Sequence, residues 1–404
     1  MRGHAPTLRD VADLAGVSST TVSRVISRSG FVSAGARAAI KQAIDELGYV
    51  PSASARGLAS RHTGMVGLCL PVVEADADLA DRRSSGPARG APGGEAVTMV
   101  VDAEPDSLVS WGGMYFGEVV RGAEFAAWDA GLAITVAMTR TPDLEARVLN
   151  MAGRVDGMVV VSGTLPEDLL EHVARRVPVV LLTGLSPVSA HDRVTVSNAE
   201  GVERLVDHLV ADHGITTFEY VGAWTGTPDD DERFRGFRRA LLRAGLEAPE
   251  APRLRGDLGR GRGREIGEAL VAGLSRGVAL PGALVCCNDN TALGLLDVFA
   301  AYGIRVPDDV VVTGFDGIEA TRTSAPPLTT VEQPMAELGR AAVEVLTARI
   351  AEPARRTVTR SLPVTVALRA SCGTHPASLW PIRRALLPPE GFVNGPRVVL
   401  GRVR

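Results

Sequence analysis

The side chains most often used in catalysis and metal binding are few in this chain and follow no known catalytic pattern. The four cysteines include an adjacent pair, and none has the spacing typical of a zinc site or a disulfide framework. The seven histidines form no HExxH motif and no ligand cluster, and His172 and His208 are expected on helix surfaces. No Gly-x-Ser-x-Gly elbow occurs. We therefore predict no catalytic residue, no metal site and no cofactor.

A glycine run at Gly259, Gly261 and Gly263 resembles a phosphate-binding loop. It does not directly follow a clear strand, and it lacks the spacing of either standard nucleotide fingerprint. Nucleotide binding is therefore not expected, and an enzyme is the disfavoured class.

Hydrogen-bonding chemistry of another kind is available in residues 18–26. Ser18 can cap a helix with two faces. At 100° per residue, Val22, Val25 and Ile26 share one face, and Ser19, Thr20, Ser23 and Arg24 share the other. This slim polar face suits entry into the major groove of DNA. A small helical bundle with a solvated face is the alternative.

Two further helices are predicted around this one. Thr7 and Asp10 can form a capping box ahead of an apolar stripe that ends at Gly16. Ser33 can cap a third helix, which Gly48 stops. The Gly-containing turn between the first two helices is typical of a helix-turn-helix module.

The charge is distributed unevenly along the chain. The formal net charge is −4, yet residues 1–62 alone carry +4, which leaves −8 for the remainder. A basic module on an acidic body indicates an anionic partner for the module, and nucleic acid is the commonest.

The chain has 404 residues, enough for two or three domains. With 45% hydrophobic and 22% charged residues, the composition is that of an ordinary globular protein. No apolar run approaches the roughly 18 residues of a membrane-spanning helix, and the first thirty residues carry charges where a signal peptide is apolar. We expect no membrane partner and a cytoplasmic location.

From residue 64 onward, short apolar runs alternate with helical patterns, which predicts crossover units and parallel sheets with helices on both faces. Strands are expected at 65–70, 132–138, 157–161, 177–182, 217–221, 283–287 and 310–315. Helices are expected near 116–130, 144–153, 166–175, 199–212, 231–245, 264–275, 290–302 and 335–350. So many strands favour two lobes. Ligands bind outside the carboxyl ends of parallel strands, so the natural site lies between the lobes.

Several segments together make the chain recognisable. They are residues 7–26 (TLRDVADLAGVSSTTVSRVI), Val32-Ser33, Gly48-Tyr-Val-Pro51 and Ala55-Arg-Gly-Leu-Ala59. This pattern closely resembles the lactose-repressor (LacI/GalR) family of bacterial transcription regulators. The resemblance implies that Ser19, Thr20 and Arg24 reach base edges and that Thr7 and Ser23 hold phosphates. It makes the segment with Ala55, Arg56 and Leu58 a hinge helix, in which Leu58 enters the minor groove as an apolar wedge. Ser18 and Ser33 complete the predicted DNA-binding set.

The resemblance continues to about residue 372, through segments such as Tyr115–Gly122, Glu232–Phe237, Cys287–Gly294, Val312–Asp316 and Pro327–Gln333. It implies an effector site lined by Tyr115, Phe116, Thr183, Arg233, Asn288 and Asp316. A guanidinium, an amide and a carboxylate can satisfy sugar hydroxyls, and aromatic rings can cover the apolar face of a sugar. Capping by Asn288 and Asp316 and solvation of Arg233 are the alternatives. Leu258 and Thr183 depart from the family pattern, which leaves the ligand class open.

We predict an all-α helix-turn-helix domain at 1–50, a hinge at 51–62 and a two-lobed periplasmic-binding-protein-like α/β domain at 63–372. Residues 74–110 are an insertion, read as a lid or a tolerated loop, and 373–404 form a tail that is flexible or packed on the body. The tail and insertion identify no function.

The predicted protein is a ligand-responsive transcriptional regulator that acts as a repressor. It binds palindromic double-stranded operator DNA as a homodimer in the bacterial cytoplasm, associated with the nucleoid. Its effector is a small sugar or sugar derivative. One alternative is a sugar-binding protein of the periplasmic-binding type without a DNA-binding role. Another is an enzyme built on the same fold.

Overall fold

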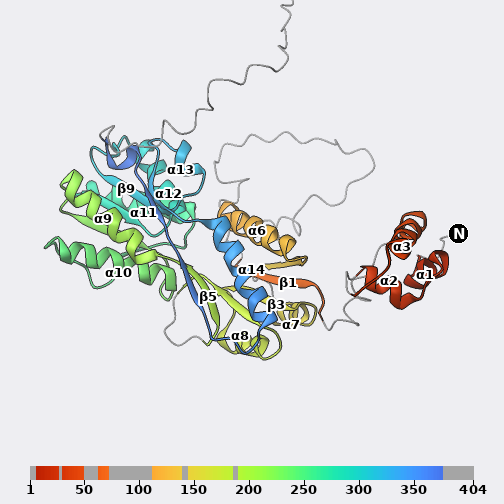
Figure 1. Cartoon of the computed structure of the whole chain (residues 1–404). Helices are drawn as coiled ribbons and strands as arrows, with labels where there is room; N and C mark the ends of the chain where they lie inside the picture. The colour runs from red at the N-terminus through yellow and green to blue at the C-terminus, as the bar shows by residue number, and fades with distance from the viewer. Residues whose placement is uncertain are drawn as a thin grey trace, which may run out of the picture. The chain divides into compact units, whose positions relative to one another are not determined.

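The computed structural model describes residues 6–26, 30–49, 62–71, 112–138, 144–184 and 190–375 (Figure 1). The predicted hinge residues Ala55, Arg56 and Leu58 lie outside these ranges, as do the predicted insertion 74–110 and the tail beyond residue 375.

Three helices form at the N-terminus, as the sequence predicts. They are α1 (Leu8–Ala15), α2 (Ser19–Ile26) and α3 (Ala34–Leu47). Val11, Val22 and Ile40, one from each helix, have no exposed surface and meet in a common core. A left-handed glycine ends α1 and another ends α3, at φ of 66° and 61° respectively. This core fixes which face of each helix points outward.

The remaining described chain forms two compact units, each built from separated segments. The first unit takes residues up to Asn198, then 225–232 and 333–364, and the second takes 199–224, 233–332 and the chain from Thr365 onward. Each unit contains one six-stranded sheet. The helical module and two sheets together confirm the predicted fold class.

The sheet of the first unit is wholly parallel, in the order β11-β5-β4-β3-β1-β2. Its strands are β1 (Met65–Leu70), β2 (Ala133–Met138), β3 (Gly157–Val161), β4 (Val179–Leu182), β5 (Asp192–Val196) and β11 (Thr359–Leu362). Its helices are α6 (Gly112–Asp129), α7 (Leu144–Ala152), α8 (Glu167–Ala174) and α14 (Met335–Ala351). Helices α7 and α8 share one apolar core with Met158 and Val160, whereas α14 packs on β3, β4 and β5.

The sheet of the second unit has the order β12-β10-β9-β8-β6-β7, with β12 antiparallel to β10 and the other pairs parallel. Its strands are β6 (Phe218–Gly222), β7 (Leu254–Arg255), β8 (Ala283–Cys286), β9 (Val311–Asp316), β10 (Thr329–Glu332) and β12 (Thr365–Ala367). Helices α9 (Asn198–His213) and α10 (Pro228–Arg243) begin at the boundary of this unit. Helices α11 (Arg260–Leu274), α12 (Asp289–Ala301), α13 (Ala320–Thr323) and the 3-10 turn η1 (Ala370–Cys372) complete it.

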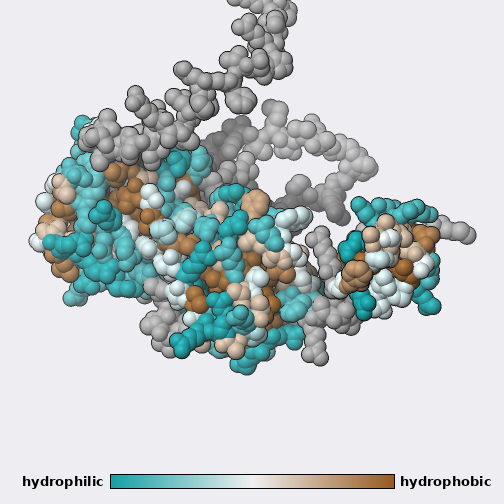
Figure 2. Space-filling view, in the orientation of Figure 1, coloured by the Kyte–Doolittle hydropathy of each residue, from teal (hydrophilic) through white to brown (hydrophobic). Residues whose placement is uncertain are grey.

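All seven predicted strands and all eight predicted helices of the body are present; β1 and β3 have the predicted ends, and the other elements have shifted ends. Five short strands (β5, β7, β10, β11 and β12) and helix α13 were not predicted from periodicity. Strand β5 was not predicted because it begins with Asp192 and Arg193, two charged residues that are nevertheless buried. On the face shown in Figure 2, hydrophilic residues are interspersed with hydrophobic ones. Across the described ranges, no helix is both long and apolar enough to cross a membrane.

Candidate functional site

Three hydroxyl side chains cap the helices of the N-terminal module. Thr7 Oγ1 accepts a hydrogen bond from the backbone N–H of Asp10 at 3.3 Å, and the Asp10 carboxylate accepts one from the Thr7 N–H at 2.7 Å. Ser18 Oγ accepts from the Thr21 N–H at 3.2 Å, and Ser33 Oγ from the Ala36 N–H at 3.3 Å. These contacts confirm the predicted caps. A phosphate contact by Thr7, which is exposed, remains a prediction.

Helix α2 presents the polar face that the sequence predicts. Ser19, Thr20 and Arg24 are exposed, and Ser23 is half-buried. Val22, on the opposite face, is fully buried against α1 and α3 and thereby fixes the rotation of the helix. Two hydroxyls and one guanidinium are therefore available to hydrogen-bond the base edges of a major groove.

In the second unit, Arg233 and Asp316 come together as predicted. Nη1 of Arg233 donates a hydrogen bond to the Cys287 carbonyl at 2.6 Å and lies 3.8 Å from Oδ1 of Asp316. Its Cζ atom lies 3.7 Å from the centroid of the Phe315 ring, a cation–π contact. Both charged side chains are largely buried, with 8% and 12% exposed. The cluster is therefore polar and mostly removed from water.

Asn288 follows Cys287, whose carbonyl binds Arg233, and caps α12. Its Oδ1 accepts a hydrogen bond from the Thr291 N–H at 3.2 Å, and its Nδ2 donates one to the Leu258 carbonyl at 2.8 Å. The capping alternative for Asn288 is therefore confirmed. An amide nitrogen carries two N–H groups, so capping does not exclude a contact with a ligand.

Backbone strain occurs at the positions singled out for effector binding. Thr183, Leu258 and Asp316 are the non-glycine residues of the described ranges with positive φ, at 66°, 67° and 126°. Residues other than glycine rarely adopt a positive φ, and backbone strain of this kind costs about 1–3 kcal/mol per residue. Thr183 and Asp316 belong to the predicted site, and Leu258 accepts the hydrogen bond of Asn288.

Asp289 is a residue whose role sequence reasoning missed. It is fully buried, and its carboxylate accepts hydrogen bonds from the N–H groups of Gly317 and Ile318 and from the Thr330 hydroxyl, at 2.6, 3.0 and 2.5 Å. Burial, followed by the nearby Asp316 carboxylate, raises the pKa of Asp289 well above its usual range. Asp289 thus holds the loop that directly follows Asp316 at the end of β9. Its position in an Asn-Asp pair before a helix was the available signal, and that signal suggested only a cap.

The predicted residues of the first unit lie on separate elements. Tyr115 and Phe116 are neighbours on α6, with ring centroids 5.0 Å apart in an edge-on arrangement. Thr183 follows β4, where its carbonyl accepts hydrogen bonds from Ser162 Oγ at 2.6 Å and from Arg193 Nη1 at 3.3 Å. Burial lowers the pKa of Arg193, a buried strand residue that was not among the predicted site residues.

Comparison with known proteins extends these observations over most of the chain. Residues 7–52 match the model of bacterial regulatory proteins of the lacI family, and residues 206–372 match a periplasmic binding protein-like domain. The transcriptional repressor PurR of Photobacterium profundum is 30% identical over 352 residues, which cover 85% of this chain and 92% of that protein.

Solved structures show the same similarity. A lac repressor dimer bound to operator and the anti-inducer ONPF aligns with a TM-score of 0.71 and 25% identity, covering 92% of this chain and all of that one. A complex of the transcriptional regulator CelR with cellobiose aligns with a TM-score of 0.61 and 28% identity, covering 91% and 99% of the two chains.

Proposed function

The chain belongs to the lacI family of bacterial regulatory proteins and is a ligand-responsive DNA-binding repressor rather than an enzyme, and we propose that it binds a near-palindromic operator as a homodimer. Two modules would place their α2 helices in major-groove half-sites about 34 Å apart. Such a protein works in the bacterial cytoplasm, where its operator is found. The exposed polar face of α2 carries the proposal, because Ser19, Thr20 and Arg24 can hydrogen-bond base edges.

Arg24 is the residue proposed to read a base, because its guanidinium can make two hydrogen bonds to a guanine edge. We expect Arg24→Ala to cost about 1–3 kcal/mol of operator binding and to relax preference at one base pair. The measurement is a gel shift with the promoter beside the protein's own gene, with point variants of that promoter, and over a range of salt concentrations. Wild-type binding should be specific and should weaken steeply with salt.

Arg37→Ala is the matched control, because Arg37 is also an exposed arginine of the module but lies on α3. Any loss caused by Arg37→Ala should be equal for all operator variants, as expected of a phosphate contact. Equal discrimination by wild-type protein and Arg24→Ala would refute the base contact. Binding to no promoter fragment in preference to competitor DNA would refute the operator proposal and favour a binding protein without a DNA role.

We further propose that the effector is a small sugar or sugar derivative and that Arg233, Asp316 and Asn288 contact it. The guanidinium and carboxylate lie close enough to hydrogen-bond adjacent hydroxyls of one polyol. Strained backbone at Asp316 and Leu258 is of the kind found at ligand-binding positions. The complex of the relative CelR with cellobiose supports a carbohydrate as the ligand class.

A further inference from the structure

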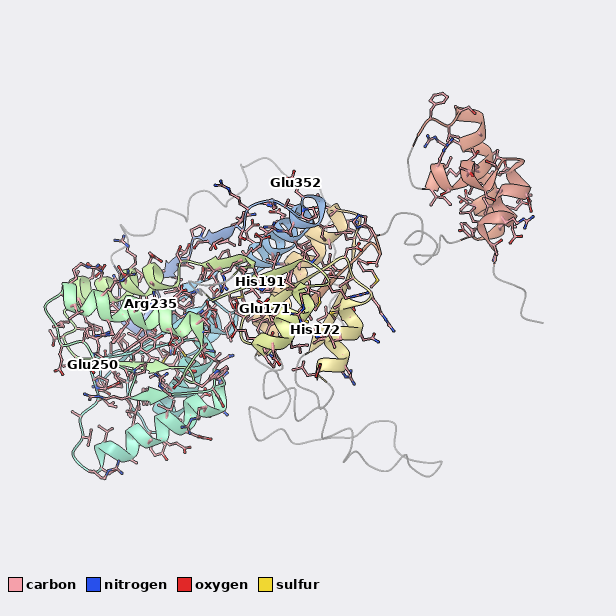
Figure 3. All side chains as sticks on the ribbon, turned by 90° about the horizontal axis from the view of Figure 1, so that it is seen from below. Glu171, His172, His191, Arg235, Glu250 and Glu352 are labelled. Carbon is pink, nitrogen blue, oxygen red and sulfur yellow. The ribbon has the colours of Figure 1, made fainter. Side chains whose placement is uncertain are left out.

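Three histidines and one cysteine converge in the second unit. His208 and His213 lie on α9, and Cys372 and His375 lie at the end of η1 and just beyond it. The potential ligand atoms of these four residues all lie within 4.8 Å of one another. The predicted surface position of His208 is wrong, because its side chain is only 10% exposed. His172, labelled on α8 in Figure 3, is exposed as predicted.

Four of the six distances between the donor atoms fit a tetrahedral metal site, and all six are within 4.8 Å. Nε2 of His208 lies 3.1 Å from Nε2 of His213 and 3.2 Å from Nε2 of His375. Sγ of Cys372 lies 3.4 Å from Nε2 of His375 and 4.0 Å from Nε2 of His208. Zn–N bonds of 2.0–2.1 Å and Zn–S bonds of 2.3 Å separate ligand nitrogens by about 3.3 Å, and a nitrogen from a sulfur by about 3.6 Å. Each observed distance is within about 0.4 Å of these values.

Residues outside the cluster orient two of its members. Nδ1 of His208 lies 2.6 Å from the Asp212 carboxylate, so a proton on Nδ1 leaves the Nε2 lone pair facing the other three residues. A carboxylate behind a histidine is the common outer partner of protein metal ligands. The Thr329 hydroxyl lies 3.0 Å both from Sγ of Cys372 and from the Arg369 carbonyl oxygen, and its one proton can be donated to the sulfur once the sulfur carries negative charge. Asp212 and Thr329 thus each contact one of the four potential metal ligands.

The backbone beside the cluster leaves room for the rings. Gly373 has a φ of 120°, and a Cβ atom there would lie 3.0 Å from Cε1 of His213. A pocket of about 630 Å³ is lined by His213, Cys372 and Thr374, among other residues of the second unit. An ion can therefore reach the cluster from this pocket.

We propose that His208, His213, Cys372 and His375 bind one divalent transition-metal ion, for which Zn²⁺ is the best match, and that the ion fastens residues 370–375 to the end of α9. Mixed imidazole and thiolate ligands favour Zn²⁺ over Mg²⁺ and Ca²⁺. Four protein ligands fill a tetrahedral shell, so the site is structural and holds no open position for catalysis. Binding converts the Cys372 thiol to a thiolate and releases one proton to solvent.

The test titrates full-length, untagged, chelator-treated protein with Zn²⁺ alone. We expect saturation at one ion per chain and a higher melting temperature for the loaded protein, because the ion binds the native state. Co²⁺ in place of Zn²⁺ should give the intense visible absorption of a tetrahedral site and a thiolate-to-metal charge-transfer band. Absence of saturable Zn²⁺ uptake, or of the charge-transfer band, would overturn the proposal without affecting the operator proposal.

Four variants locate the ion. Cys372→Ser and His375→Ala should each abolish stoichiometric uptake, and Asp212→Asn should weaken binding about 10- to 100-fold by releasing His208. His172→Ala, which alters an exposed histidine of α8, should bind like wild type. Circular dichroism and operator binding verify that each variant is folded. If a variant is unfolded, the charge-transfer band of the wild-type Co²⁺ protein still tests whether a cysteine binds the metal. Equal uptake by wild type and a folded Cys372→Ser variant would place the ion elsewhere.

Discussion

Asp192 shows how a single buried charge contributes to stability. Its carboxylate, 1% exposed, accepts two hydrogen bonds from Arg349, at 2.7 and 2.9 Å, and one from the Val358 N–H at 2.8 Å. Burial raises the pKa of Asp192, but the Arg349 and Val358 hydrogen bonds outweigh burial, and the net pKa lies below its ordinary value. The folded protein therefore favours the charged form, which ties α14 and the start of β11 to β5.

The resulting stability depends on pH. Because the folded pKa is lower than the unfolded one, the contribution is complete above the unfolded value of about 4 and is lost as the pH falls through the folded pKa. We expect Asp192→Asn to lower the unfolding free energy by roughly 3 kcal/mol at pH 7 and by less near pH 3. Urea denaturation at both pH values measures this.

Asp309→Asn is the control, because Asp309 pairs with Arg305 at the surface, where ion pairs contribute little. It should leave the urea midpoint nearly unchanged at either pH. If Asp192→Asn lowered the unfolding free energy as much at pH 3 as at pH 7, the packing of the side chain rather than its charge would be responsible for the stabilisation.

At the scale of elements, helices α6 and α14 cross too closely for a side chain at two positions. A Cβ atom on Gly122 would lie 1.7 Å from the Ala336 carbonyl oxygen, and one on Gly339 would lie 1.9 Å from that of Val119. Gly117, also in α6, has no atom within 4 Å of its Cβ position.

These two environments predict opposite effects of the same substitution. Gly122→Ala should lower the unfolding free energy by at least about 1–3 kcal/mol, because the helices must move apart. Gly117→Ala should raise it by about 0.5–1 kcal/mol, because alanine favours the helix and meets no obstacle. Thermal unfolding of both variants and wild type provides the measurement. Stabilisation by Gly122→Ala would contradict the close crossing.

Sequence periodicity was sufficient for elements with a strong apolar pattern and insufficient elsewhere. The strand at Met65–Leu70 was predicted with its exact ends. Strand β5 was not, because it begins with two charged residues whose burial depends on partners far along the chain, and β11 is a short, mostly polar strand. In the site, Arg233 and Asp316 could be predicted from the family resemblance. Asp289, Arg193 and the histidine cluster could not, because their roles arise from contacts between segments that the sequence does not place side by side.

Gly263 belongs to the run that resembled a phosphate loop. A Cβ there would lie 2.4 Å from the Thr291 carbonyl oxygen, so helix packing explains this glycine.

At the scale of the whole molecule, effector binding must be linked to operator binding. A ligand that weakens operator binding by some factor is itself bound more weakly by the DNA complex by the same factor. An inducer therefore binds the DNA-free protein more tightly, and a co-repressor binds the DNA complex more tightly.

This linkage makes the sugar proposal measurable. We expect one member of a panel of mono- and disaccharides to raise the melting temperature, by the equivalent of about 2.7 kcal/mol at 100 times its dissociation constant. Nucleosides and sugar phosphates in the same panel test other ligand classes. Arg233→Ala should remove the shift, because it deletes the guanidinium proposed to bind hydroxyls.

Arg235→Ala is the matched control for that variant. Arg235 lies on the same helix, labelled in Figure 3, and is exposed where Arg233 is buried. Its loss should leave the shift unchanged. A sugar-induced shift that survives in folded Arg233→Ala would remove this residue from the effector site, and stabilisation by nucleosides alone would replace the sugar as the ligand class.

The order of strands in the first sheet bears on biosynthesis. Strand β11 pairs with β5, yet 166 residues separate Val358 from Asp192. At about 5–20 residues per second, a ribosome needs about 10–30 s to supply the missing partner. During that interval the β5 edge of the sheet is unpaired, and its backbone N–H and C=O groups can hydrogen-bond to other strands. The edge of β5 is therefore exposed to misfolding and aggregation until β11 has been synthesised, an interval in which chaperone binding would help. In truncated chains that end before residue 359, this edge remains unpaired.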